Sequence, residues 1–219
     1  MDLAIVHHEL VIDIQDALLS VAFNVGPISE VGGVFDDMCK QLQALGICHL
    51  MEFANLDEFH QNLTRSAHAR RYYLWRSRSE GVTDDRFLAL TRTESTLDAI
   101  AAGQVGLTRQ IADYSIDAWR ADWEYEDDYC YYALLHELIR RPQDFGAAPT
   151  RLLLNRFDHA LEGAESPQRD ACVALADRDV SALCEALERL CAAEEERNDA
   201  AREGIGDTKA MSRVCLECR

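Results

Sequence analysis

Apolar residues recur at helical spacing through almost all of this 219-residue chain. The first segment shows the pattern, because a helix turns by about 100° per residue and residues three or four apart share a face. Its apolar positions are Ile5, Val6, Leu10, Ile14, Ala17, Leu18 and Val21. Alternation typical of a strand never extends beyond four residues, and only four prolines interrupt the chain. The sequence therefore predicts an all-α protein.

Turn and capping residues divide the chain into about nine or ten predicted helices. Asn55 or Asp57 is expected to cap one helix, Ser166 with Pro167 another, and Asp179 a long one. A second helix is expected to end at Gly46, and residues 95–102 and 104–120 are expected to form two helices, or one helix with a kink at Gly103. Short connections favour mostly antiparallel helix pairs in a single domain over residues 1–219. The loop at 142–149, with two prolines and a glycine, is the best candidate for a subdomain boundary.

The net charge of −17 restricts the classes of partner. Such a charge repels nucleic acid and anionic membranes, so direct binding to either is not expected. The acids are concentrated near the N-terminus, where residues 1–64 hold ten acids and one base, Lys40. The N-terminus lacks a basic region followed by an apolar core, so the expected compartment is the cytoplasm.

Metal and cofactor motifs are not evident. The sequence His136-Glu137-Leu138-Ile139-Arg140 departs from the zinc motif H-E-x-x-H, because its last residue is arginine. Cys215 and Cys218 lack a second ligand pair nearby, and cysteines such as Cys130 and Cys184 are expected to be reduced core thiols. We therefore expect no metal, no cofactor and no catalytic residues. A metal-dependent helical enzyme stays open as the less favoured class.

One segment, residues 119–139 (WRADWEYEDDYCYYALLHELI), combines four tyrosines with six acids, five of which lie within residues 122–128. Treated as a single helix, it places an apolar stripe on one side. The stripe consists of Trp123, Cys130, Leu134 and Leu138, and Asp127 falls in its middle. Glu124 and Asp128 lie to one side of the stripe and are expected to present charge outward.

A carboxylate on a core-facing stripe requires a partner, because an unpaired buried charge is costly. The predicted partner of Asp127 is Arg70 or Arg71, from a stretch with five arginines and no acid at residues 65–78. The alternative, a paired-carboxylate catalytic site, needs two carboxyl groups with different pKa values in a cleft. The ion pair is the favoured interpretation.

Four stretches together resemble the immunity 49 family of bacterial polymorphic toxin systems. They are SAHARRYYLWRS, LDAIAAGQ, WEYEDDYCYYALLHELI and RDACVALADRDVSALCEALERL, within roughly residues 65–219. The resemblance implies a helical cytoplasmic protein encoded beside a secreted toxin, including toxins of type VI secretion. It brings no catalytic residues. In the family an apolar helix follows the point where this chain ends, so a truncated C-terminus is expected.

The resemblance implies inhibition by binding, and an acidic protein suits a toxin with a basic cleft, such as a nuclease. We expect a tight one-to-one complex with a DNase. The expected contact residues are all acids: Asp122, Glu124, Asp128, Asp84, Asp85, Glu194, Glu195 and Glu196. The alternative partner relationship is a helical adaptor or chaperone that binds an effector without inhibiting it.

Overall fold

The computed structural model describes residues 3–24 and 26–203, with side chains described through residue 193 and at Glu195. Within these residues it contains nine α-helices, no strands and three short 3-10 helices. The α-helices are α1 (Leu3–Ala22), α2 (Gly32–Phe53), α3 (Leu56–Ser79), α4 (Ser95–Ala101), α5 (Val105–Tyr114), α6 (Glu126–Arg140), α7 (Ala148–Ala160), α8 (Pro167–Asp177) and α9 (Val180–Glu203). The 3-10 helices are η1 (Ile28–Val31), η2 (Arg86–Leu88) and η3 (Leu90–Arg92). The all-α prediction is confirmed. The predicted final helix and the Cys215–Cys218 pair lie outside the described residues.

The chain forms two compact units, Met1–Ile116 and Asp117–Arg219. The division therefore falls just before Asp117, whereas residues 142–149 lie inside the second unit. In that unit α6 and α7, which flank this loop, pack against each other. At Gly146 the backbone of the loop lies directly against α8. A Cβ at this position would be 2.5 Å from the Ala176 carbonyl oxygen, too close for any side chain. The φ of +102° at Gly146 further favours glycine.

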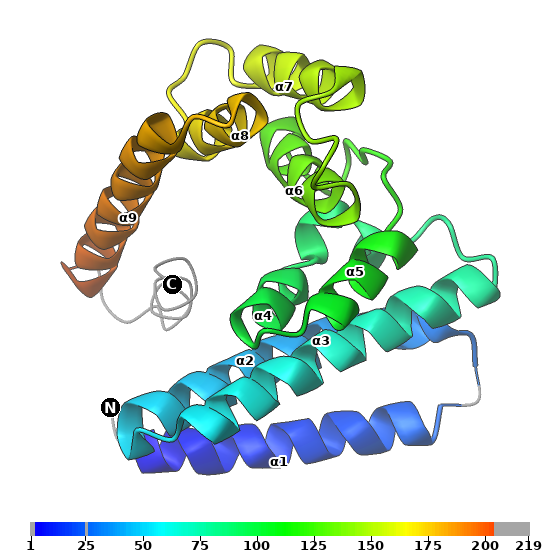
Figure 1. The fold of residues 1–219 in the computed structure, drawn as a ribbon. Coiled ribbons are helices and arrows are strands. Elements are labelled where there is room, and N and C mark those ends of the chain that lie inside the picture. The colour runs from blue at the N-terminus through cyan, green and yellow to red at the C-terminus, as the bar shows by residue number, and fades with distance from the viewer. Residues whose placement is uncertain (1–2, 25, 204–219) are drawn as a thin grey trace. The chain divides into compact units, whose positions relative to one another are not determined.

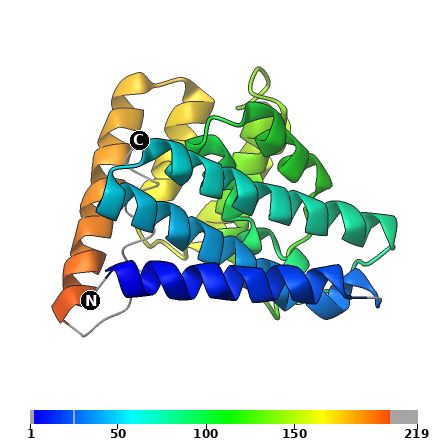
Figure 2. The same cartoon turned by 90° about the horizontal axis from the view of Figure 1, so that it is seen from below.

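In the first unit, α1, α2 and α3 run alternately up and down, and α4 and α5 pack on α3 (Figures 1 and 2). Apolar residues from all five helices and from the η1 and η2 segments meet in one core. The buried members are Ile14, Ile28, Phe35, Met38, Leu42, Leu45, Ala67, Tyr73, Leu74, Leu88, Ala99, Leu107 and Ile111. Helix α3 lies at the centre of this unit, since it contacts α2, α4 and α5.

Gly46 lies within α2, so the prediction that it ends the second helix is wrong. The glycine is buried where α2 passes close to α3. A Cβ at this position would lie 3.2 Å from the Phe59 carbonyl oxygen and 3.3 Å from the Asn62 Cβ. The absence of a side chain thus permits the close packing of two backbones. The helix ends seven residues further on, at Phe53, and the capping residue Ala54 adopts a left-handed conformation with φ of +48°.

The predicted capping residues are confirmed at three helix starts. The Asn55 side chain accepts a hydrogen bond from the Glu58 backbone N–H at 3.1 Å. Ser166 accepts one from the Arg169 N–H at 3.2 Å, with Pro167 in the first helical position. Asp179 accepts one from the Ala182 N–H at 3.1 Å. These signals are local, which explains why the sequence reveals them.

In the second unit α6 packs against α7 and α8, and α8 packs against α9. Its buried residues include Cys130, Leu134, Leu154, Phe157 and Cys172. Cys184 is exposed, so its predicted place in a core is wrong. No helix in the described part of either unit is long and apolar enough to cross a lipid bilayer.

Replacing Gly46 by leucine tests the close contact of α2 with α3. We expect a loss of about 2 kcal/mol in the free energy of unfolding, because the added side chain overpacks a filled interface. The matched control is Gly106→Leu in α5, where a Cβ would meet nothing within 4 Å. There the change should be neutral or stabilising, by up to about 0.8 kcal/mol, since leucine favours helix more than glycine does. Urea unfolding followed by circular dichroism measures both, and equal effects would contradict the packing argument.

Candidate functional site

The acidic and aromatic segment at residues 119–139 begins as a loop. Helix α6 starts at Glu126, so the prediction of one helix over the whole segment is wrong at its N-terminal end. In the preceding loop, the Glu124 carboxylate accepts a hydrogen bond from the Arg120 backbone N–H at 3.1 Å. The Trp119 indole N–H donates to the Glu124 carbonyl oxygen at 3.3 Å. These local bonds offer the backbone groups an alternative to helical hydrogen bonds.

The loop changes the predicted role of Glu124. The helical wheel placed this residue on the outer rim, but its side chain is only 8% exposed. Its carboxylate is directed back to the backbone of its own loop. Glu124 therefore has a structural role, and the expectation that it presents its charge outward is wrong. Asp122 and Asp128 are exposed, as a partner-binding surface requires.

Arg156 of α7 organises the start of α6. Its Nε lies 2.6 Å from the Glu126 carboxylate. Its guanidinium carbon also lies 5.2 Å from the centre of the Trp119 ring and 4.9 Å from that of Tyr129. A guanidinium within about 6 Å of an aromatic face is attracted by the negative face of the ring. One arginine thus holds together a loop, α6 and α7.

A second arginine, Arg140, connects the C-terminal end of α6 to Asp117, the first residue of this unit. Arg140 forms an ion pair with the Asp117 carboxylate. The Tyr129 hydroxyl donates a hydrogen bond to the Asp117 carbonyl oxygen at 3.4 Å. Burial raises the pKa of Tyr129 above its ordinary value, which keeps this hydroxyl protonated and able to donate. The acidic segment therefore has internal cationic partners within its own unit.

The predicted pairing of Asp127 with Arg70 or Arg71 joins residues of different units. Asp127 is half-buried in the second unit. Arg70 is 3% exposed in the first unit, where it donates to the carbonyl oxygens of Phe87 at 2.7 Å and Ala89 at 3.5 Å. Desolvation by burial lowers the pKa of Arg70. Backbone carbonyls thus accept from the buried guanidinium, and the pairing with Asp127 stays a prediction.

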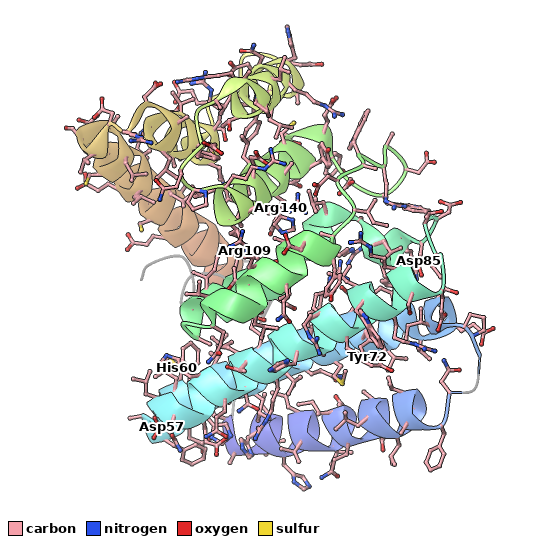
Figure 3. All side chains as sticks on the ribbon, turned by 45° about the vertical axis from the view of Figure 1, so that its right-hand side comes forward. Asp57, His60, Tyr72, Asp85, Arg109 and Arg140 are labelled. Atoms are coloured by element: carbon pink, nitrogen blue, oxygen red, sulfur yellow. The ribbon has the colours of Figure 1, made fainter. Side chains whose placement is uncertain are left out.

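The remaining predicted contact acids fall in both units. Asp84 is exposed, whereas Asp85 is half-buried and accepts hydrogen bonds from the Tyr73 hydroxyl at 2.7 Å and the Phe87 N–H at 2.9 Å. Figure 3 shows Asp85 near the C-terminal end of α3. Asp85 therefore holds the η2 segment in place. On α9 Glu195 is exposed, while the side chains of Glu194 and Glu196 lie outside the described part.

Sequence reasoning missed a buried carboxyl group, Asp98 of α4, which is 1% exposed. The Ser66 hydroxyl of α3 donates to it at 2.5 Å, and the Gln43 amide of α2 donates at 2.8 Å. Desolvation raises the pKa of Asp98 to about 7, although both hydrogen bonds lower it, and nearby Glu94 adds to the increase. The other buried residues of α4 are Ser95, Thr96 and Ala99, so the local sequence identifies neither the burial of Asp98 nor its hydrogen-bond partners.

An open pocket of about 490 Å³ lies along the N-terminal half of α3. Its lining is polar and consists of Asp57, His60, Gln61, Thr64, Arg65 and Gln104. Figure 3 shows Asp57 and His60 close to one end of this helix. Within the described residues, no group of three or more His, Cys, Asp or Glu side chains is arranged to hold a metal ion.

Comparison of the chain with protein-family models, with curated proteins and with solved structures found no match. Function is therefore inferred from the chain's own residues and their geometry.

The buried carboxyl group predicts a pH-dependent stability. Because the pKa of Asp98 is about 7 in the folded chain and its ordinary value is 3.8, the folded state keeps a proton that the unfolded state releases. The contribution of this group to the free energy of unfolding is fully present below pH 4 and is lost as pH rises through 7. The Asp98→Asn variant has no group to ionise at this position. Relative to the wild type, its free energy of unfolding should therefore rise by up to about 4 kcal/mol between pH 4 and pH 8. Urea unfolding of both proteins at several pH values measures this difference, and a constant difference would contradict it.

Substitution of Arg156 by glutamine should destabilise the second unit by about 1 kcal/mol, through loss of a partly exposed ion pair and two ring contacts. Trp119 fluorescence should also shift, since its ring loses a cation. Arg151→Gln is the matched control: Arg151 pairs with Asp177 at 2.5 Å, with both side chains almost half exposed. That change should cost less than about 0.5 kcal/mol. Thermal unfolding compares the two, and similar losses would show that Arg156 has no special role.

Proposed function

We propose that this protein neutralises a toxin that acts in the cytoplasm by forming a tight one-to-one complex with it. The proposed toxin is a nuclease, specifically a DNase with a basic substrate cleft. The observation that carries the proposal is that many of the cationic side chains form ion pairs with carboxylates of this same protein. Many of the ion pairs join arginines to acids of the same unit, including Arg76–Glu80, Arg140–Asp117, Arg156–Glu126, Arg169–Asp158 and Arg189–Asp170.

This distribution leaves the outer surface with an excess of carboxylates. The chain holds 39 acids against 22 lysines and arginines, so pairing with these cations still leaves carboxylates in excess. An excess of negative charge attracts a basic protein over a distance of about one Debye length, about 8 Å at physiological salt. Attraction of this kind raises the rate of association. A bound acidic protein can then exclude nucleic acid from a basic cleft.

Among the predicted contact acids, Asp122 and Asp128 are the best candidates in the second unit. Both are exposed; Asp128 lies within residues 123–139, one of the four stretches that carry the family resemblance, and Asp122 lies directly before it. In the first unit Asp84 is exposed, and on α9 Glu195 is exposed. Glu124 and Asp85 are excluded, because their carboxylates are engaged with their own loops.

The decisive experiment coexpresses the full chain with the product of the adjacent gene. We expect protection of the cell and a complex that survives size-exclusion chromatography. Protection without inhibition of nuclease activity in vitro would favour another mode of neutralisation. A stable complex with neither protection nor inhibition would favour the adaptor alternative. Absence of both complex and protection would contradict the proposal.

Charge reversal tests the two favoured acids. Asp122→Lys with Asp128→Lys should slow association with the toxin about tenfold at low salt, because steering contributes mainly to the association rate. Glu162→Lys with Glu165→Lys is the matched control, since it makes the same change in net charge at another exposed loop. Stopped-flow measurements at two salt concentrations compare the association rates of the two double variants with the toxin. Equal rates for both variants would remove Asp122 and Asp128 from the interface.

A further inference from the structure

Helix α1 is apolar on two opposite sides. One side faces the core of the first unit, where Ile14 is buried and Leu10 and Val21 pack beside it. The opposite side carries Ile5, Ile12, Leu19 and, directly after the helix, Phe23. These four side chains are 58%, 44%, 54% and 78% exposed, respectively. Burying a large apolar side chain contributes about 1.5–3 kcal/mol, so four exposed in one row mark a surface that a partner can cover.

The spacing of this row fits a helical partner. Ile5, Ile12 and Leu19 are seven residues apart, and positions seven apart drift by only about 20° around a helix. From Ile5 to Phe23 the row extends for about 27 Å, at about 1.5 Å per residue. A seven-residue apolar repeat keeps one side of a helix against a second helix over several turns. The row is therefore suited to a helix of about eighteen residues.

The charges beside this row specify the chemistry of the partner. Glu9 and Asp16 lie next to the row, Asp13 lies further round the helix, and all three are exposed. Helix α1 contains no lysine or arginine, and none of these three carboxylates forms an ion pair with another described residue. We name the surface formed by these acids and the four apolar residues the outer face of α1. Within its unit α1 packs on α2 along the edge of the helical layer (Figures 1 and 2).

We infer that the outer face of α1 binds an apolar helix of the partner protein whose flanks carry lysine or arginine. Three uncompensated carboxylates attract such flanks. The same carboxylates oppose a second copy of this chain, which would bring acids against acids, and they oppose an anionic membrane. The inference rests on the proposed function, because it specifies where a toxin docks and by which kind of element.

A synthetic helix tests the surface without the toxin. The probe is an eighteen-residue peptide with leucine at the two core heptad positions and lysine at the flanking positions, with glutamate replacing lysine in its control. Calorimetry with the full chain should show binding of the lysine peptide at least tenfold tighter than of the glutamate peptide. Equal affinity of both peptides would overturn the inference.

Two variants of the chain locate the binding. Ile12→Ser with Leu19→Ser removes apolar area, and Glu9→Lys with Asp13→Lys and Asp16→Lys reverses the charge. Each should weaken binding of the lysine peptide at least tenfold while helical circular dichroism stays unchanged. Val105→Ser controls for the first, since Val105 is 79% exposed on α5. Glu165→Lys with Glu185→Lys and Glu188→Lys controls for the second, at three other exposed acids. The inference would be overturned if the control variants bound the lysine peptide as weakly as the α1 variants do.

Other occupants give different results. A dimer in light scattering that Ile12→Ser with Leu19→Ser abolishes would assign the face to a second copy. Binding to phosphatidylglycerol vesicles that the same variant abolishes would assign it to a membrane. Either result would overturn the inference.

The coexpression experiment separates this inference from the proposed function. A toxin that the wild type neutralises and the α1 variants do not would support both. Equal protection by the wild type and the α1 variants would leave the proposed function standing and overturn the docking site. Peptide binding that depends on α1, without protection by the wild type, would support the surface and contradict the immunity function.

Discussion

The first unit depends on the close approach of α2 to α3 at Gly46. A glycine there lets the two backbones pass with no side chain between them. This approach brings Ser66 of α3 and Gln43 of α2 to the same point, where both donate to Asp98 of α4. A buried carboxyl group is tolerated because its hydrogen bonds are made and because it can hold its proton. Packing and polar contacts thus fix the same three helices.

The second unit uses a different device at the start of α6. A loop closed by Glu124 precedes the helix, and the Arg156 guanidinium lies against Glu126, Trp119 and Tyr129. The arginine provides charge for the acids and a planar group for the rings, a combination that lysine does not offer. The acidic segment is therefore largely a structural element, and only Asp122 and Asp128 at its exposed edge are left as candidates for partner contact.

The functional proposals follow from how charge and apolar area are distributed. Arginines are engaged within their own units, while exposed carboxylates accumulate outside, most clearly on α1, which has no basic residue. Charge of one sign directs encounter with a partner, whereas exposed apolar side chains supply affinity after encounter. The outer face of α1 has both, so it satisfies more of the requirements of a docking surface than the acids near α6 do.

The sequence by itself determined the helical class and the starts of α3, α8 and α9. Apolar periodicity and capping residues such as Asn55, Ser166 and Asp179 act over a few residues, so they can be recognised in the sequence. It indicated the exposed acids Asp122 and Asp128 but misassigned Glu124, because the helical wheel assumed a helix where local hydrogen bonds form a loop. Only the tertiary structure decided that Gly46 continues a helix, that carbonyls accept from Arg70, and that Asp98 is buried. These features depend on residues far apart in the chain, and no local pattern specifies which of them meet.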